Sequence, residues 1–201
     1  YLEAVGRGVD TQQAKDLTIA AWDQVQNDPE WRVATERESL ARLLDRTSLW
    51  LTQSRSRMTL VGAELDLDVA VDEGVRIRGR MDRLEVDESG DHWVVDLKTG
   101  GQAVSQSAAQ QHVQLTAYQL ALRNGALHDG RVTDLAPGEE GRPVGGGVLV
   151  YPGTKTKEVS TREQAAHPPE VLEEFASLLP GLVRELRGPT LTARARRCTA
   201  L

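Results

Sequence analysis

Two aspartates and one lysine near the middle of the chain are the side chains best suited to chemistry. Asp96 and Lys98 are two residues apart in a short apolar stretch, and Asp82 lies fourteen residues before Asp96. Side chains two apart on a strand leave the same face, and a neighbouring antiparallel strand can bring Asp82 beside them. Paired carboxylates are the oxygen ligands that hard divalent cations such as Mg²⁺ prefer. The pattern therefore predicts a metal-dependent site.

Lys98 adds proton transfer to this chemistry. Four of the 24 basic residues are lysines and the others are arginines, so a lysine beside the aspartates is unusual for this chain. An ammonium group can orient a water molecule for attack on a phosphodiester and exchange a proton with it, which a guanidinium does far less readily. A divalent cation would neutralise the charge that develops on the phosphate. The three residues together predict hydrolysis of a phosphate ester.

Alternating apolar and polar residues predict the strands that carry these side chains. Residues 60–72 are apolar at the odd positions from 61 to 71, which indicates a strand with one buried face. A turn at 72–74 leads to a return strand over 75–82, where arginines alternate with apolar residues. Most of the facing acids and arginines are expected to pair across the two strands. A third strand is predicted at 92–98.

Helices are predicted on both sides of these strands in the sequence. Apolar residues at three- and four-residue spacing predict helices at 12–26, 28–53 and 106–123. A fourth strand is predicted at 148–151, and a last helix at 168–187 that is bent or interrupted at Pro180. Residues 124–147 and the polar stretch up to 167 are expected to be irregular. The predicted fold class is α/β, with a mixed central sheet of about four strands flanked by helices.

Three motifs carry a resemblance to a known family. Residues 79–85 read GRMDRLE, residues 95–100 read VDLKTG, and Gln114 is followed by Tyr118. In this order they resemble the G-x-x-D-R-x-E, V-D-x-K-T-G and Q-x-x-x-Y motifs of the PD-(D/E)xK nuclease superfamily. The narrower resemblance is to its RecB-type nuclease domains, found in helicase-nucleases of the RecBCD, AddAB and AdnAB kind. It implies a restriction-endonuclease-like core and a metal-dependent deoxyribonuclease, with an exonuclease expected.

The resemblance assigns roles to the aspartates and the lysine. It implies that Asp82 and Asp96 bind Mg²⁺ or Mn²⁺, joined by the backbone carbonyl of Leu97. It also implies that Lys98 acts on the attacking water. These residues are the predicted catalytic and metal-binding set.

Three further residues are candidates for contacts with the substrate. Gln114 and Tyr118 are four residues apart and share a helix face, where an amide and a phenol could position the site or contact DNA. Without the motif, a surface glutamine and a packed tyrosine are the alternative. Arg83 is a candidate phosphate contact, and a structural role is its alternative.

The register of the first hairpin determines whether a third acid lies at the site. If the loop is tight and centred on residue 73 or 74, either Glu64 or Asp66 lies opposite Asp82. Glu64 is therefore a candidate outer metal ligand. Its alternative is to pair with an arginine on the return strand.

Two features depart from the family pattern. RecB-type domains usually carry a metal-binding histidine on a helix before the strands, and residues 1–58 contain none. We expect this histidine either to lie upstream of residue 1 or to have been lost, which would leave the domain weak or inactive. The histidines that are present follow the hairpin and are predicted to be surface or turn residues: His92, His112, His128 and His167.

The second departure concerns an iron–sulfur cluster that many relatives bind through four cysteines. Cys198 is the one cysteine of this sequence. It lies where the cysteine cluster of those relatives begins, so a cluster is conceivable in a longer protein. This chain by itself cannot build one.

Composition limits the class of protein. A length of 201 residues indicates one domain or at most two, and a single cysteine excludes a disulfide-stapled fold. Neither a membrane span nor a secretory signal is recognisable. The formal net charge of −6 argues against a protein that coats nucleic acid by bulk charge. We expect a soluble protein of the bacterial cytoplasm, associated with the nucleoid.

The predicted organisation is one RecB-like domain over residues 1–201, as an excerpt of a larger helicase-nuclease. Residues 1–58 form a helical lead-in, 59–151 the catalytic core, and 152–201 a C-terminal helix and tail. The expected partners are DNA, favouring single strands, and a helicase motor that feeds them during double-strand-break repair and recombination. The alternatives are a degenerate module with a structural or DNA-guiding role, a stand-alone or CRISPR-adaptation exonuclease, and a solvated sheet face without a site.

Overall fold

A mixed sheet forms the centre of the computed structural model, which describes residues 1–54 and 56–187. Over these residues the sheet has seven strands in the order β4-β5-β1-β2-β3-β6-β7. The pairs β1–β5 and β3–β6 are parallel, and the other neighbours are antiparallel. The strands are β1 Met58–Asp72, β2 Val75–Asp87, β3 His92–Leu97, β4 Gly125–His128, β5 Arg131–Asp134, β6 Val144–Tyr151 and β7 Ser160–Ala165. The predicted α/β class and mixed central sheet are confirmed, but the sheet has seven strands, not about four.

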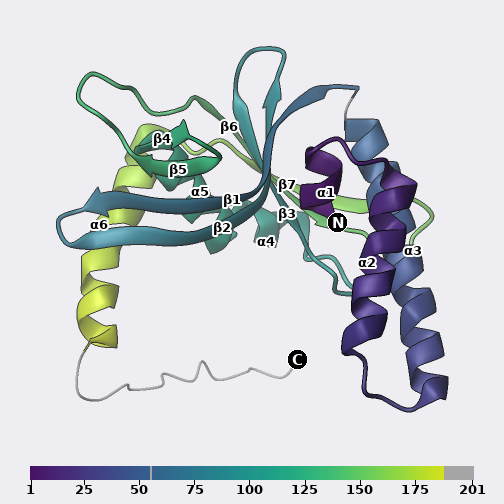
Figure 1. Cartoon of the computed structure of the whole chain (residues 1–201). Coiled ribbons are helices and arrows are strands. Elements are labelled where there is room, and N and C mark those ends of the chain that lie inside the picture. The colour runs from purple at the N-terminus through teal and green to yellow at the C-terminus, as the bar shows by residue number, and fades with distance from the viewer. Residues whose placement is uncertain (55, 188–201) are drawn as a thin grey trace.

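Helices cover both faces of this sheet. They are α1 Leu2–Gly6, α2 Thr11–Val25, α3 Glu30–Ser54, α4 Gln106–Gln110, α5 Val113–Arg123 and α6 Pro169–Leu186. Figure 1 shows α1–α3 at one end of the molecule and α6 at the other. One apolar core lies between α5 and the sheet, and a second lies between α1–α3 and the sheet. Each face of β3 therefore contacts a different helical layer.

Three strands that periodicity does not predict are short or polar, and a fourth starts earlier than predicted because its first residues are mostly glycine. β4 and β5 have four residues each, and β7 carries polar side chains at most positions, so none of them shows a recognisable period of two. β6 begins at Val144, four residues before the predicted start, and contains three consecutive glycines. A Cβ atom at Gly145 would lie 2.3 Å from Nε1 of Trp93, so the glycine makes room for that indole ring.

The helix predicted at 106–123 is two helices. α4 ends at Gln110 and α5 begins at Val113. Gln164 of β7 is fully buried, and its side-chain amide donates to the backbone carbonyls of Ala109, Gln110 and His112 at distances of 3.2–3.3 Å. This tertiary contact satisfies carbonyls that a continuous helix would have bonded internally. It fixes the position at which α5, and the side chains on it, begin.

Two other predicted elements differ at their ends. α1 precedes the first predicted helix and is too short for a periodic signal. α6 runs through Pro180 as one helix, so the predicted interruption is absent. A proline removes one backbone hydrogen bond, which a helix can accommodate with a local adjustment. Cys198 lies outside the described residues.

At Glu64, the apolar side chains of β1 change the face of the sheet toward which they point. Ala63 packs with the α1–α3 core, whereas Leu65 belongs to the core under α5. Glu64 between them has a φ of 54°, in the left-handed region that side chains other than glycine rarely adopt. Such a conformation costs about 1–3 kcal/mol and persists only where the surroundings impose it. It lets both apolar residues face a core and turns the strand beside Asp82.

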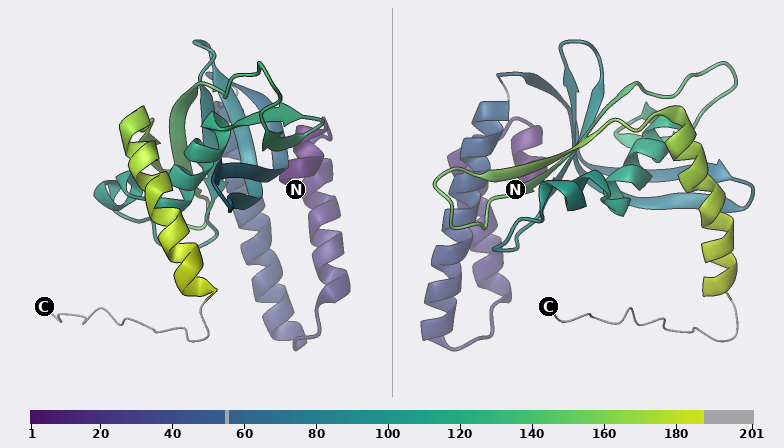
Figure 2. Two further views of the ribbon diagram at one scale, coloured as in Figure 1. Left: turned by 90° about the vertical axis from the view of Figure 1, so that its left-hand side faces the viewer. Right: turned by 180° about the vertical axis from the view of Figure 1, so that it is seen from behind.

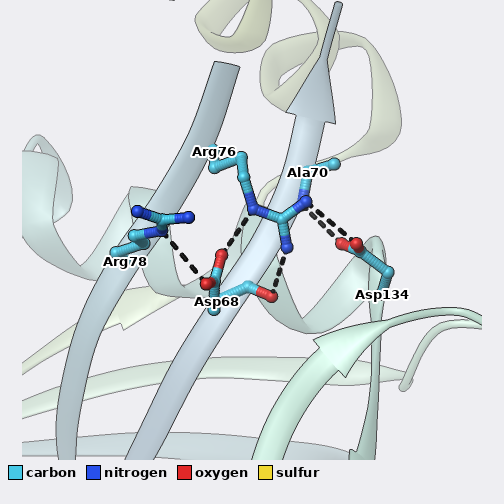
Figure 3. A network of polar contacts seen from close by, with 5 residues as sticks. All are labelled: Asp68, Ala70, Arg76, Arg78 and Asp134. Carbon is cyan, nitrogen blue, oxygen red and sulfur yellow. Dashed lines mark hydrogen bonds and ion pairs between the residues drawn. The ribbon is translucent and has the colours of Figure 1, made fainter. Parts of the chain in front are cut away.

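An ion-pair network on the hairpin fixes its direction (Figure 3). Arg76 donates to Asp68 on β1 and to Asp134 at the end of β5, and Arg78 contacts the other oxygen of Asp68. Asp134 also accepts from the backbone amide of Ala70 at 2.7 Å. The predicted pairing of acids with arginines across the strands is thus confirmed. The network ties three strands together on their exposed face, so the hairpin is held against β5.

Candidate active site

Asp82 and Asp96 lie side by side on neighbouring strands. β2 and β3 pair antiparallel with Arg83 opposite Val95, so the next position along the ladder brings the two aspartates together. The backbone amide of Leu97 donates to Oδ2 of Asp82 at 2.7 Å. The Asp96 side chain is 5% exposed, and Asp82 is half-buried. The fold therefore holds two carboxylates near the end of β3, one of them almost out of water.

Lys98 is held between a carboxylate and an amide. Its Nζ lies 2.7 Å from Oδ2 of Asp96 and donates to Oε1 of Gln114 at 2.9 Å. An ammonium group has three N–H donors, so one remains for a third partner. The side chain is 33% exposed, which leaves its end open to a water molecule or a phosphate oxygen.

Helix α5 supplies a chain of hydrogen bonds that orients this lysine. Gln114 donates from Nε2 to the phenol oxygen of Tyr118 at 3.0 Å, and Tyr118 donates to the backbone carbonyl of Arg80 at 2.8 Å. The amide of Gln114 thus has a fixed orientation, with its oxygen toward Lys98. Gln114 and Tyr118 share one face of α5, as their spacing predicts. The structure places them behind Lys98, where they position its ammonium group.

Groups around Asp82 shift the pKa of its carboxyl in opposite directions. Burial raises the pKa of the Asp82 carboxyl, the Leu97 amide lowers it, the nearby charge of Asp96 raises it, and Lys98 lowers it. Burial likewise raises the pKa of the Tyr118 phenol. Two carboxylates at this separation repel each other, so an added positive charge would stabilise both in their ionised form. Lys98 provides part of that charge.

Comparison with known proteins points to one family. A family model described as the PD-(D/E)XK nuclease superfamily matches residues 2–200 of the chain. The chain belongs to this superfamily. Asp82, Asp96 and Lys98 match the acids and the lysine of the superfamily pattern, and Met81 stands in the place of its proline. A search of curated proteins returned no match.

The superfamily generally uses divalent metals, and the residues present fit such a cation. Oδ2 of Asp96 is buried, and its partner among the described residues is the Lys98 ammonium group, 2.7 Å away. A carboxylate has about four lone-pair sites, so Asp96 can also bind a metal cation. No three carboxylate, imidazole or thiol groups of the described residues form a complete cage. A Mg²⁺ site commonly has only one or two carboxylates, with waters and phosphate oxygens completing it.

The hairpin register resolves which acid faces Asp82. Ala63 pairs with Arg83 and Leu65 with Met81, which puts Glu64 across from Asp82. Burial raises the pKa of Glu64, and the charge of Asp82 raises it further. Asp66 instead pairs with Arg80 at 2.9 Å, the alternative considered for these acids. Glu64 borders the site as a neighbour of Asp82, and its role as a metal ligand stays a prediction, as does that of the Leu97 carbonyl.

Arg83 points away from the candidate site. It lies on the opposite face of β2 from Asp82 and is fully buried. Its Nε donates to Glu85 at 2.6 Å, and Ser54 of α3 donates to the other oxygen of that carboxylate at 2.7 Å. The structure therefore does not put Arg83 where it could contact a phosphate. It places Arg83 in a buried ion pair under α3, the structural alternative for this residue.

The four histidines all follow the β1–β2 turn in the sequence. His92 is buried at the start of β3, which corrects its prediction as a surface or turn residue. His112 lies in the turn between α4 and α5, as predicted, but near the site. Burial lowers the pKa of His112, and the charge of Lys98 lowers it further. The sequence did contain a signal for this proximity, because His112 lies two residues before Gln114.

Proposed function

We propose that this chain is a RecB-type nuclease domain that hydrolyses phosphodiesters of DNA with Mg²⁺ or Mn²⁺. The observation that carries the proposal is the convergence of Asp82, Asp96 and Lys98 at the end of β3, with the Asp96 carboxylate almost fully buried. The three motifs of RecB-type domains contain these residues together with Gln114 and Tyr118.

The mechanism assigns each side chain a task. Asp82 and Asp96 would hold the cation, which would supply positive charge where the phosphate becomes more negative. Lys98, held by Asp96 and Gln114, directs its remaining N–H toward the attacking water. It releases one of its own protons to solvent and takes up the proton that the water loses on attack, which restores its charge. Tyr118 and Gln114 keep Lys98 in this orientation.

The proposed setting is a helicase-nuclease that acts in double-strand-break repair and recombination, in the bacterial cytoplasm at the nucleoid. A helicase motor would hold the DNA and deliver a single strand to this domain. A net charge of −6 supports this division of work, since the domain needs to bind only a few phosphates. The described residues contain no helix that is long and apolar enough to cross a membrane.

The substrate is tested with oligonucleotides labelled at the 5′ or the 3′ end, as single strands and as duplexes. We expect single strands to be degraded faster than duplexes, with short products from one end accumulating first. Equal cleavage of both forms at interior positions would contradict the proposed mode. A folded wild-type protein that cleaves neither form would favour a degenerate domain with a structural role, which the absence of a histidine from residues 1–58 would explain.

A further inference from the structure

A basic cleft lies between α3 and the loop that joins β6 to β7. It has a volume of about 450 Å³. Figures 1 and 2 show this loop and the loop that follows β3 beside α3 from both directions. Three cations and three threonines line it: Arg42, Arg46, Lys155, Thr99, Thr154 and Thr156. None of the described residues that line it is acidic. Such a concentration of positive charge is unusual in a chain of net charge −6.

Arg46 forms the base of the cleft and is held by backbone carbonyls. Its guanidinium donates to the carbonyls of Pro152, Thr156 and Glu158 at 2.7–2.9 Å. Carbonyl oxygens satisfy these donors but carry no net charge. In the described structure no carboxylate pairs with Arg46, so its positive charge is not neutralised and favours an anion in the cleft.

The two other cations lie at the rim. Lys155 is exposed and forms no ion pair with a described residue. Arg42 contacts Glu38 at 3.2 Å, and both side chains are more than 60% exposed. An exposed pair of this kind is held weakly, so Arg42 can turn toward an anion at little cost. Both side chains are long enough to follow a flexible ligand.

The cleft adjoins the candidate active site. Thr99 directly follows Lys98, and the backbone amide of Lys98 donates to the carbonyl of Val150 at 2.8 Å, just before the β6–β7 loop. A Cβ atom at Gly153 would lie 2.5 Å from the carbonyl oxygen of Thr99, so this loop packs tightly against the segment after β3. Lys98 faces α5 and the cleft faces α3, so a strand that passes around the end of β3 would contact both.

A larger cavity elsewhere has the opposite charge. It measures about 540 Å³ and lies between the end of α3 and the sheet, beside Trp50 and Trp93. Its charged lining residues are three glutamates and one arginine, which leaves a negative excess: Glu85, Glu158, Glu163 and Arg57. Phosphate groups would be repelled there, so volume alone does not select the site for a nucleic acid.

We propose that the basic cleft binds a phosphate group of the nucleic-acid strand whose scissile phosphodiester lies at Asp82, Asp96 and Lys98. The inference rests on the proposed function and adds a second point of contact to it. The ligand is either an internal phosphodiester or the terminal phosphate of the strand. Charge in the cleft would hold the strand in place while the next phosphate is cleaved.

The test measures binding of a fluorescent single-stranded oligonucleotide by anisotropy, in an Asp96→Asn background that leaves the strand intact. We expect Lys155→Gln with Arg42→Gln to weaken binding roughly tenfold. The slope of log Kd against log salt should fall by about 0.7 for each phosphate that the variant no longer neutralises. The single variant Lys155→Gln is compared with Lys157→Gln as its matched control, because each removes one positive charge from the same exposed loop and Lys157 does not line the cleft. The affinity of Lys157→Gln should stay near that of the parent.

The outcomes separate this inference from the proposed function. If the Lys155 and Arg42 variants match the Lys157→Gln control in affinity and salt slope, the cleft does not bind the strand, even if the wild-type protein cleaves DNA. If binding depends on Lys155 and Arg42 but the wild-type protein never cleaves DNA, phosphate binding in the cleft is supported and the proposed nuclease activity is wrong. Oligonucleotides with and without a 5′ or 3′ phosphate identify the ligand: a loss confined to one phosphorylated end indicates the terminal group, and an equal loss indicates an internal phosphodiester.

Discussion

Lys98→Gln should lower the rate of DNA hydrolysis by about 10²–10⁴-fold while leaving affinity for a single strand nearly unchanged. This is the usual contribution of a positioned acid–base group. Glutamine keeps a donor for Gln114 but carries neither the charge nor the exchangeable proton of the ammonium group. The measurement is single-turnover cleavage of a labelled single strand, with binding followed separately.

Two variants define what Lys98 contributes. Lys98→Arg retains the positive charge but holds its proton far more firmly, so activity should stay low if proton transfer matters. Lys157→Gln removes a lysine charge from an exposed loop and should cleave like the wild type. Wild-type rates in Lys98→Gln would show that the lysine has no part in hydrolysis.

Glu85→Ala should destabilise the protein by about 3–5 kcal/mol, because it leaves the guanidinium of Arg83 buried without its carboxylate. Arg83 and Glu85 are 0% and 2% exposed, so the ion pair lies out of contact with bulk solvent in the folded protein. Chemical denaturation followed by tryptophan fluorescence measures the free energy of unfolding. Trp50 and Trp93 line the cavity next to Glu85 and should report the transition.

A paired replacement tests whether this loss comes from the unpaired charge. Arg83→Met combined with Glu85→Leu removes both charges and fills similar volume, so it should recover most of the stability lost in Glu85→Ala. A loss below about 1 kcal/mol in Glu85→Ala, the range of exposed ion pairs, would contradict a structural role for this pair.

The part of the site that local sequence determines could be predicted. The alternating residues around Asp82 and Asp96 indicate strands, and antiparallel neighbours bring these two aspartates together. The spacing of Gln114 and Tyr118 indicates one helix face, which the structure turns toward Lys98. These relations depend on periods of two and of 3.6 residues, which are visible in a single sequence.

Other features depend on contacts between distant segments. The break between α4 and α5 is stabilised by Gln164, more than 50 residues downstream of it. The choice of Glu64 over Asp66 follows from the hairpin register, which is the same on both sides of Glu64 and shifts near the turn, between Ala70 and Asp72. The side strands β4 and β5 are too short for a period to emerge, and β7 is polar at most positions. Their position in the sheet follows from tertiary packing.

The basic cleft shows the same limitation. Its cations come from α3 and from the β6–β7 loop, more than 100 residues apart in the sequence. In the sequence Arg42 and Arg46 are two among many arginines of a mixed-charge helix. Their significance appears only when the loop, with Lys155, packs against that helix. A net negative composition therefore concealed a local positive site.

The measurement that tests the metal-dependent site most directly is cleavage of a labelled single strand by the wild type and by Asp96→Asn, with Mg²⁺, Mn²⁺ or a chelator. The asparagine side chain has nearly the shape of aspartate but lacks its charge, so the fold should persist while the cation site is lost. We predict products only from the wild type and only with a cation. Cleavage that continues in the chelator, or at wild-type rate in Asp96→Asn, would contradict a metal-dependent nuclease site at Asp96.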